Sequence, residues 1–175
     1  MTMLKMMVYS LAAMLFCSPA LAESGAYQIE VIVFSQAMPN TEAFEQTVSK
    51  IQWPSGLTEL SAYKKPDSTT LDDSYAALSK DSTYRPMLHI AWIQPAGSGP
   101  VRIQGADGKL NGYLQVQHEQ NLQMTVDLEF SASRNDNSGG AIIYRLNEKR
   151  PIKLNEVYYF DHPKFGVIAK TSPVN

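Results

Sequence analysis

The chain has 175 residues, of which 44% are apolar and 18% are charged, and its formal net charge is −2. This composition is too apolar for a disordered chain and too weakly charged for a protein that binds nucleic acid. The length suits one domain with one core, and beyond the N-terminal segment no apolar run is long enough to span a membrane.

The N-terminal segment, Met1–Ala22, has the pattern of a secretory signal peptide. A short region with one lysine precedes an apolar stretch, and Pro19 and Ala20-Leu21-Ala22 then form an A-x-A cleavage pattern. A buried N-terminal helix is the alternative, but the segment lacks a polar stripe. We therefore predict cleavage between Ala22 and Glu23, followed by a single domain over residues 23–175. Cleavage removes the only cysteine, Cys17, and with it disulfides, thiol catalysis and cysteine-ligated zinc.

The first part of the exported chain predicts one strand and two helices. Tyr27–Phe34 is rich in β-branched and aromatic residues, which predicts a central strand covered on both faces. Apolar residues at helical spacing predict a helix over Thr41–Lys50. A second helix is predicted to begin after Thr70, as its N-cap, and to end near Lys80.

From Tyr84 onward the apolar pattern has period two. The cleanest alternation lies in Leu122–Phe130, where one polar face indicates an antiparallel sheet with one wet side. The fold class predicted is α+β, a largely antiparallel β-sheet with one or two helices packed on one face. The strands predicted after the helices are Met87–Ile93, Val101–Gln104, Leu110–Gln117, Leu122–Phe130, Ala141–Leu146, Ile152–Phe160 (with a break at Asn155) and Phe165–Lys170.

Groups capable of catalysis or metal binding are dispersed along the chain. His89, His118 and His162 show no metal-ligand spacing, and the sequence has no nucleophile-elbow motif. We therefore predict no catalytic residues, no metal and no cofactor. A hydrolase that uses scattered carboxylates or the Asp161-His162 pair is an alternative, because two catalytic carboxylates need not be adjacent in sequence.

Two segments contain candidate binding side chains. In Tyr84–Trp92, Trp92 is either a core residue or a ring that stacks on a sugar. In Arg145–Gly166, basic residues precede a run of aromatic residues, which suits a ligand that carries carboxylates and sugars. A solvated hairpin beside a core strand is the alternative for this second segment.

Four segments occur in a characteristic order: Tyr27–Phe34, Tyr84–Gln94 with Pro95, Leu110–Leu114 and Glu156–Ile168. Together they resemble the CsiV family of peptidoglycan-binding periplasmic proteins of Gram-negative bacteria. The last segment departs from the family's pattern at Tyr158, where we expect a histidine before Tyr159.

This resemblance implies peptidoglycan binding in the periplasm and support of cell-wall synthesis and cell shape. It implies that this support acts through a bifunctional penicillin-binding protein and its outer-membrane lipoprotein activator, and it implies no catalysis. An envelope scaffold that binds only other proteins is a further alternative. The residues that we expect to contact peptidoglycan are Arg85, His89, Trp92, Arg145, Arg150, Tyr159, Asp161 and His162.

Overall fold

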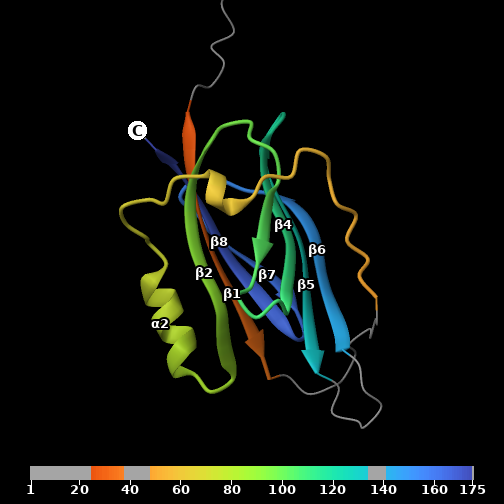
Figure 1. The fold of residues 1–175 in the computed structure, drawn as a ribbon. Helices are drawn as coiled ribbons and strands as arrows, with labels where there is room; N and C mark the ends of the chain where they lie inside the picture. The colour runs from red at the N-terminus through yellow and green to blue at the C-terminus, as the bar shows by residue number, and fades with distance from the viewer. Residues whose placement is uncertain (1–24, 38–47, 134–140, 175) are drawn as a thin grey trace, which may run out of the picture.

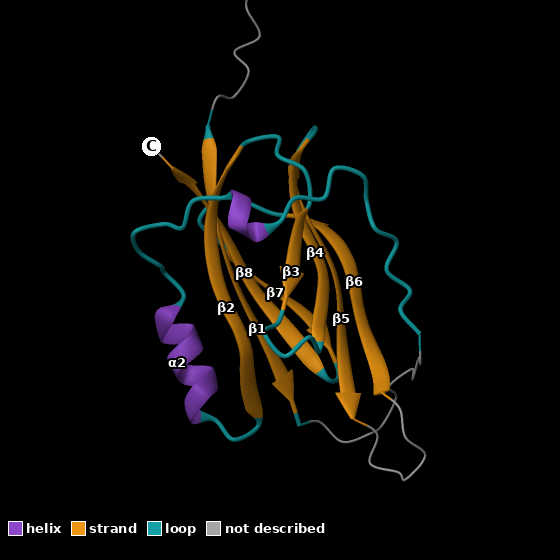
Figure 2. Cartoon of the chain, viewed as in Figure 1, coloured by secondary structure: helices purple, strands orange, loops and turns teal. Residues whose placement is uncertain are grey.

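A computed structural model describes residues 25–37, 48–133 and 141–174 of the chain. Within these residues the strands form two four-stranded sheets (Figures 1 and 2). We call the sheet with strand order β2-β1-β8-β7 sheet A, and the sheet with order β3-β4-β5-β6 sheet B. Neighbouring strands within both sheets run antiparallel.

The two sheets draw on different parts of the chain. Sheet A contains β1 (Ala26–Gln36), β2 (Tyr84–Pro95), β7 (Val157–His162) and β8 (Phe165–Val174). Sheet B contains β3 (Val101–Gln104), β4 (Leu110–His118), β5 (Leu122–Ser133) and β6 (Ala141–Pro151). The 3-10 turn η1 (Leu60–Ala62) and the helix α2 (Asp72–Lys80) lie between β1 and β2 in the sequence.

The inner faces of the two sheets enclose one hydrophobic core. Ile29, Val31 and Val33 of β1 belong to the same buried cluster as Val126 and Leu128 of β5. The next residues of β1 face outward, where Ile32 and Phe34 pack with Leu71 at the start of α2. The prediction that Tyr27–Phe34 is a central strand covered on both faces is therefore confirmed.

The α+β class is confirmed in its main features, since one helix, α2, lies against the outer face of an antiparallel sheet (Figure 1). The strands divide into two stacked sheets, however, and do not form one. Alternation shows which face of a strand is buried, but it does not show whether a helix or a second sheet covers that face. No described helix is long and apolar enough to cross a membrane.

Two local predictions are revised, and two others lie outside the described residues. The helix α2 begins at Asp72, and its N-cap residue Leu71 makes no side-chain capping bond, so the predicted cap at Thr70 is wrong. The predicted strand Ile152–Phe160 is shorter, because β7 begins only at Val157, after a turn in which Asn155 has a φ of 64°. The signal peptide and most of the helix predicted over residues 41–50 lie outside the described residues.

A strap, residues 57–69, crosses one side of the molecule between the edges of the two sheets. Thr58 forms a parallel bridge to Val101 of β3, and Lys64 forms an antiparallel bridge to Ile93 of β2. Figure 2 shows η1 of this strap lying between β2 and the strands of sheet B. The strap therefore joins the edge of sheet A to the edge of sheet B.

Candidate functional site

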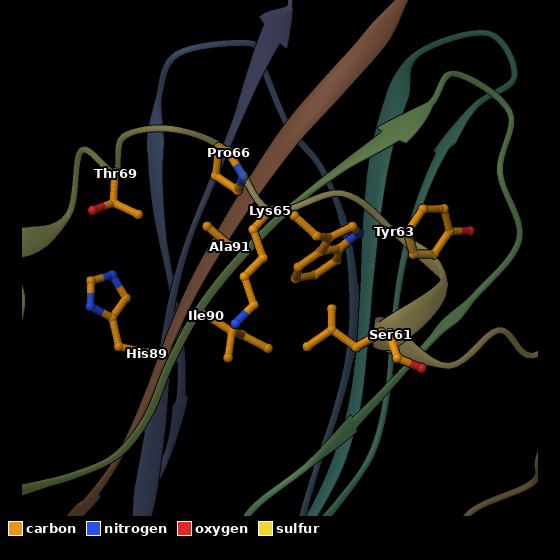
Figure 3. A pocket seen from close by; sticks show the side chains of 10 residues that line it. Ser61, Tyr63, Lys65, Pro66, Thr69, His89, Ile90 and Ala91 are labelled. Carbon is orange, nitrogen blue, oxygen red and sulfur yellow. The ribbon is translucent and has the colours of Figure 1, made fainter.

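The strap and the edge strand β2 enclose a pocket of about 490 Å³, a size that suits a small ligand (Figure 3). Four consecutive residues of β2 form one wall, and the strap forms the other. In Figure 3 the Lys65 side chain extends from the strap across the β2 residues. The lining residues are Leu60, Ser61, Tyr63, Lys65, Pro66 and Thr69 of the strap and His89, Ile90, Ala91 and Trp92 of β2.

His89 lies at one end of the pocket and is held by a buried carboxylate. Its Nε2 is 2.9 Å from Oε1 of Glu30, and its ring stacks on Tyr75 with the centroids 5.1 Å apart. Glu30 also accepts hydrogen bonds from the backbone N–H groups of Thr70 and Leu71. Burial raises the pKa of Glu30, but the bonds from His89, Thr70 and Leu71 outweigh it, so the pKa lies below its ordinary value. No side chain of the N-cap residue accepts a hydrogen bond at the start of α2. Glu30 of β1 accepts the bonds of the N–H groups there instead.

Glu30, Asp72 and His89 also form the geometry of a possible metal site, with ligand atoms within 4.8 Å of one another. The hydrogen bonds from His89, Thr70 and Leu71 already occupy both carboxylate oxygens of Glu30. Asp72 accepts a bond from the Thr69 hydroxyl at 2.7 Å, and a carboxylate in the first turn of a helix is favoured by the helix dipole. These contacts explain the cluster without an ion, and we assign it none.

Trp92 reaches the floor of the pocket but belongs to the core. Its side chain is 1% exposed, and its indole N–H donates to the side-chain oxygen of Gln94 at 2.7 Å. A ring without an open face is not available for stacking on a sugar. Of the two roles that the sequence left open for Trp92, the structure selects the core role.

A second group of predicted residues lies at the other edge of sheet A, on β7. The hydroxyl of Tyr159 donates to Asp161 at 2.7 Å, and its ring stacks on Phe34 with the ring planes 9° apart. Burial, followed by the bond to Asp161, raises the pKa of Tyr159 well above its ordinary value. Gly166 makes room for this stack, because a Cβ there would lie 2.7 Å from both rings. Tyr159 is therefore a fixed ring that is still 43% exposed.

Arg145 lies on the outer face of sheet B, away from the other predicted residues. It donates two hydrogen bonds, at 2.8 and 2.7 Å, to the two carboxylate oxygens of Asp127, which is 1% exposed. Tyr113 lies on the neighbouring strand opposite Asp127, and Trp53 packs beside it with the ring centroids 6.5 Å apart. Arg145 thus compensates a buried charge, a role that its place in a basic run did not indicate.

Arg150 and His162 pack against core aromatic rings between the two sheets, whereas Arg85 lies apart from them on β2. The Arg150 guanidinium lies 4.5 Å from the centre of the Phe160 ring and pairs with Glu148. The His162 ring packs 5.3 Å from that of Phe165, and burial lowers its pKa below the ordinary value. Arg85 is exposed, and its carbonyl accepts a 3.4 Å hydrogen bond from the hydroxyl of Ser35.

Tyr158, the departure from the expected histidine, stabilises the turn before β7. Its hydroxyl accepts a hydrogen bond from the backbone N–H of Lys153 and donates one to Glu156, both at 2.8 Å. These contacts give Tyr158 a local structural role.

The eight predicted residues therefore do not converge on one site. The structure brings together His89 and Trp92 at the pocket, and Tyr159 and Asp161 on β7. The pocket residues that the sequence missed, Tyr63 and Lys65, lie in a segment that had only the features of connecting chain. Their one signal was that Tyr63 follows Leu57 and Leu60 as an apolar residue in a stretch that has no strand or helix period.

Comparison with protein families gives a match over residues 57–174, more than half of the chain, to the family described as peptidoglycan-binding protein, CsiV. The match begins at the strap and contains every residue that lines the pocket. Comparisons with curated proteins and with solved structures gave no significant match.

Proposed function

The chain belongs to the CsiV family of peptidoglycan-binding proteins, and from this premise we propose that it binds peptidoglycan in the periplasm at the pocket beside β2. The pocket carries this proposal, because it combines mainly apolar walls with hydroxyl groups and an ammonium group, and all of its lining residues lie inside the matched region. Lys65 provides a positive charge for the carboxylates of the cell wall.

The proposal includes no catalysis. Among the described residues, His89 is bonded to Glu30, His162 is packed among aromatic rings, and Asp161 accepts the Tyr159 hydroxyl. Each of these groups thus has a structural partner, which favours a binding role over the alternative of a hydrolase. Following the resemblance of the sequence, we also propose that binding supports cell-wall synthesis and cell shape through a bifunctional penicillin-binding protein and its lipoprotein activator.

Sedimentation of the purified protein with isolated sacculi tests the binding proposal. We expect the protein to pellet with the sacculi at low salt, and the double variant Tyr63→Ala/Lys65→Ala to remain largely in the supernatant. Lys149→Ala is the matched control, because Lys149 is an exposed lysine on sheet B, outside the pocket. If the native protein stays in the supernatant even when sacculi are present, the proposal is contradicted.

The same incubation distinguishes the two alternatives. Release of soluble muropeptides that is lost in Asp161→Asn would indicate the hydrolase. Capture of the synthase or its activator without any binding to sacculi would indicate a scaffold that contacts only proteins.

A further inference from the structure

The strand β2 has a free edge along the pocket. The Ile93 N–H donates to the Lys64 carbonyl at 2.8 Å, so the main-chain groups of Ile93 point away from β1 and toward the strap. In an antiparallel sheet every second residue points its N–H and C=O to the same side. The main-chain groups of His89 and Ala91 therefore point to this edge as well.

The strap does not use this edge beyond Ile93. In the part of the chain that the structure describes, the main-chain hydrogen bond between strap and β2 is the one at Lys64. The strap then moves away from β2, and the pocket opens between them, beside Ile90 and Ala91. An edge strand with unpaired N–H and C=O groups is a template for a further strand.

The side chains at this edge suit a peptide better than a sugar. A sugar is bound by stacking on an open aromatic face, but Trp92 is 1% exposed. The exposed aromatic rings Trp53, Tyr75 and Tyr159 do not line the pocket, and the aromatic ring that lines it besides Trp92, Tyr63, is half-buried. The walls instead offer apolar contacts from Leu60, Tyr63 and Ile90, together with the strand edge.

Length and charge agree with this choice. At about 3.3 Å per residue, the free edge from His89 to Ala91, which ends before the Lys64 bridge at Ile93, is roughly 7 Å long, the span of two or three extended residues. Lys65 has no ion-pair partner among the described residues, and its ammonium group lies at the pocket wall. A short peptide with free carboxylates is complementary to both features.

We propose that the pocket binds the peptide part of peptidoglycan, and that this peptide extends sheet A as a strand along β2 with a carboxylate at Lys65. This inference rests on the proposed function and specifies its ligand. It assigns recognition to main-chain hydrogen bonds from His89 and Ala91, which tolerate different side chains in the peptide. The glycan strand lies outside the pocket.

Competition against sacculus binding tests the ligand. The probes are a soluble stem peptide and glycan strands from which the peptides have been removed. We expect the stem peptide to release the protein from sacculi and the bare glycan to have no effect. If bare glycan competes and the peptide does not, this inference is overturned while the proposed function stands; if no pelleting occurs at all, the proposed function itself fails.

Variants of the protein test the binding mode. Ala91→Pro removes the edge N–H, and proline is tolerated on an edge strand where that N–H faces outward. We expect affinity for the stem peptide to fall about tenfold or more, whereas Ala91→Ser, which keeps the N–H, binds as before. Lys65→Met should weaken binding similarly, and Lys65→Arg should restore it.

A second measurement leaves the protein unchanged, in case Ala91→Pro fails to fold. Stem peptides with a single N-methylated amide lose one donor at a chosen position. Because only the edge groups of His89 and Ala91 are free to pair, we expect affinity to fall about tenfold for the one or two positions whose N–H bonds to β2 and to remain for the others. Equal affinity for all N-methylated peptides would overturn the strand-addition model.

Discussion

The outer faces of both sheets bury carboxylates, and Glu30 on sheet A and Asp127 on sheet B are compensated in different ways. On sheet A, Glu30 is 1% exposed and is bonded by His89 and by the N–H groups of Thr70 and Leu71. On sheet B, Asp127 is also 1% exposed and is bonded by the guanidinium group of Arg145. One charge is thus stabilised mainly by the start of a helix, and the other by a full opposite charge.

This difference reflects what covers each face. The helix α2 packs on sheet A through apolar residues, including Leu71 and Leu78, so a buried charge there needs donors that arrive with the helix. Sheet B has no described helix on its outer face, and its alternating strands supply Arg145 from β6 directly beside β5. The pocket lies between the strap and the edge strand β2 of sheet A.

The largest effect is expected from breaking the ion pair on sheet B. Arg145→Met removes the positive charge that compensates the buried carboxylate of Asp127 and leaves it only the hydrogen bond of the Tyr113 hydroxyl, which costs about 3–5 kcal/mol of unfolding free energy. Urea denaturation measures this change. Lys153→Met is the control, because Lys153 pairs with Glu156 where both side chains are more than half exposed, and we expect it to change stability by about 0–1 kcal/mol. Equal losses in the two variants would contradict a special role for Asp127.

A smaller loss is expected from crowding the outer face of sheet A. In Gly166→Ala the new Cβ would lie 2.7 Å from the rings of Phe34 and Tyr159, and such overpacking costs about 1–3 kcal/mol. The comparison variant is Gly25→Ala, where no atom lies within 4 Å of the added Cβ. Thermal unfolding of both proteins would show whether the stack is as tight as the distances indicate; an unchanged midpoint for Gly166→Ala would contradict it.

The carboxylate on sheet A is expected to make stability depend on pH. The folded pKa of Glu30 lies below its ordinary value, so its contribution is complete above about pH 4.5 and is lost as the pH falls through the folded pKa. We expect the unfolding free energy of the native protein to decrease on acidification more steeply than that of Glu30→Gln. Urea denaturation of both proteins between about pH 3 and 7 measures this difference. If the unfolding free energies of the two proteins change with pH in parallel, the hydrogen bonds to Glu30 do not stabilise its ionised form.

The smallest effect concerns the space between the sheets. Burial lowers the pKa of His162, so its neutral form stabilises the fold above its ordinary pKa of about 6.5, and this contribution is lost as the pH falls through the folded pKa. An NMR titration of the imidazole should give a midpoint below that of the same histidine in urea-unfolded protein. Coincident midpoints would contradict the burial of the ring.

Several features of the fold could be predicted from particular residues. Leu122, Met124 and Val126 alternate with Gln123 and Thr125, and the structure buries the first set and leaves the second partly exposed. The same polar face was predicted to be wet along its whole length, but its Asp127 and Glu129 are buried. Such a pattern is local, because successive side chains of a strand always point to opposite faces. The alternation could not predict that a second sheet covers the apolar face, because a covering helix requires the same apolar residues on that face.

The candidate site could be predicted only in part. The sequence drew attention to β2, which does form one wall of the pocket, but it also included Trp92 as a candidate for stacking and grouped Arg145 with the aromatic residues of β7. It missed Tyr63 and Lys65, because a segment without periodicity gives no sign of the strand that it crosses. Hydrogen bonds between distant segments, such as Glu30 to Thr70, are decided by how the elements pack.

By itself, the sequence determined the strand pattern, the central position of β1 and the family to which the chain belongs, and the export signal stays a prediction from it. The tertiary structure alone decided the pairing of the two sheets, the compensation of Glu30 and Asp127, and the free edge of β2 beside the strap. The physical reason is range: side-chain alternation is set by neighbouring residues, whereas a pocket and a buried charge depend on segments that meet only after folding.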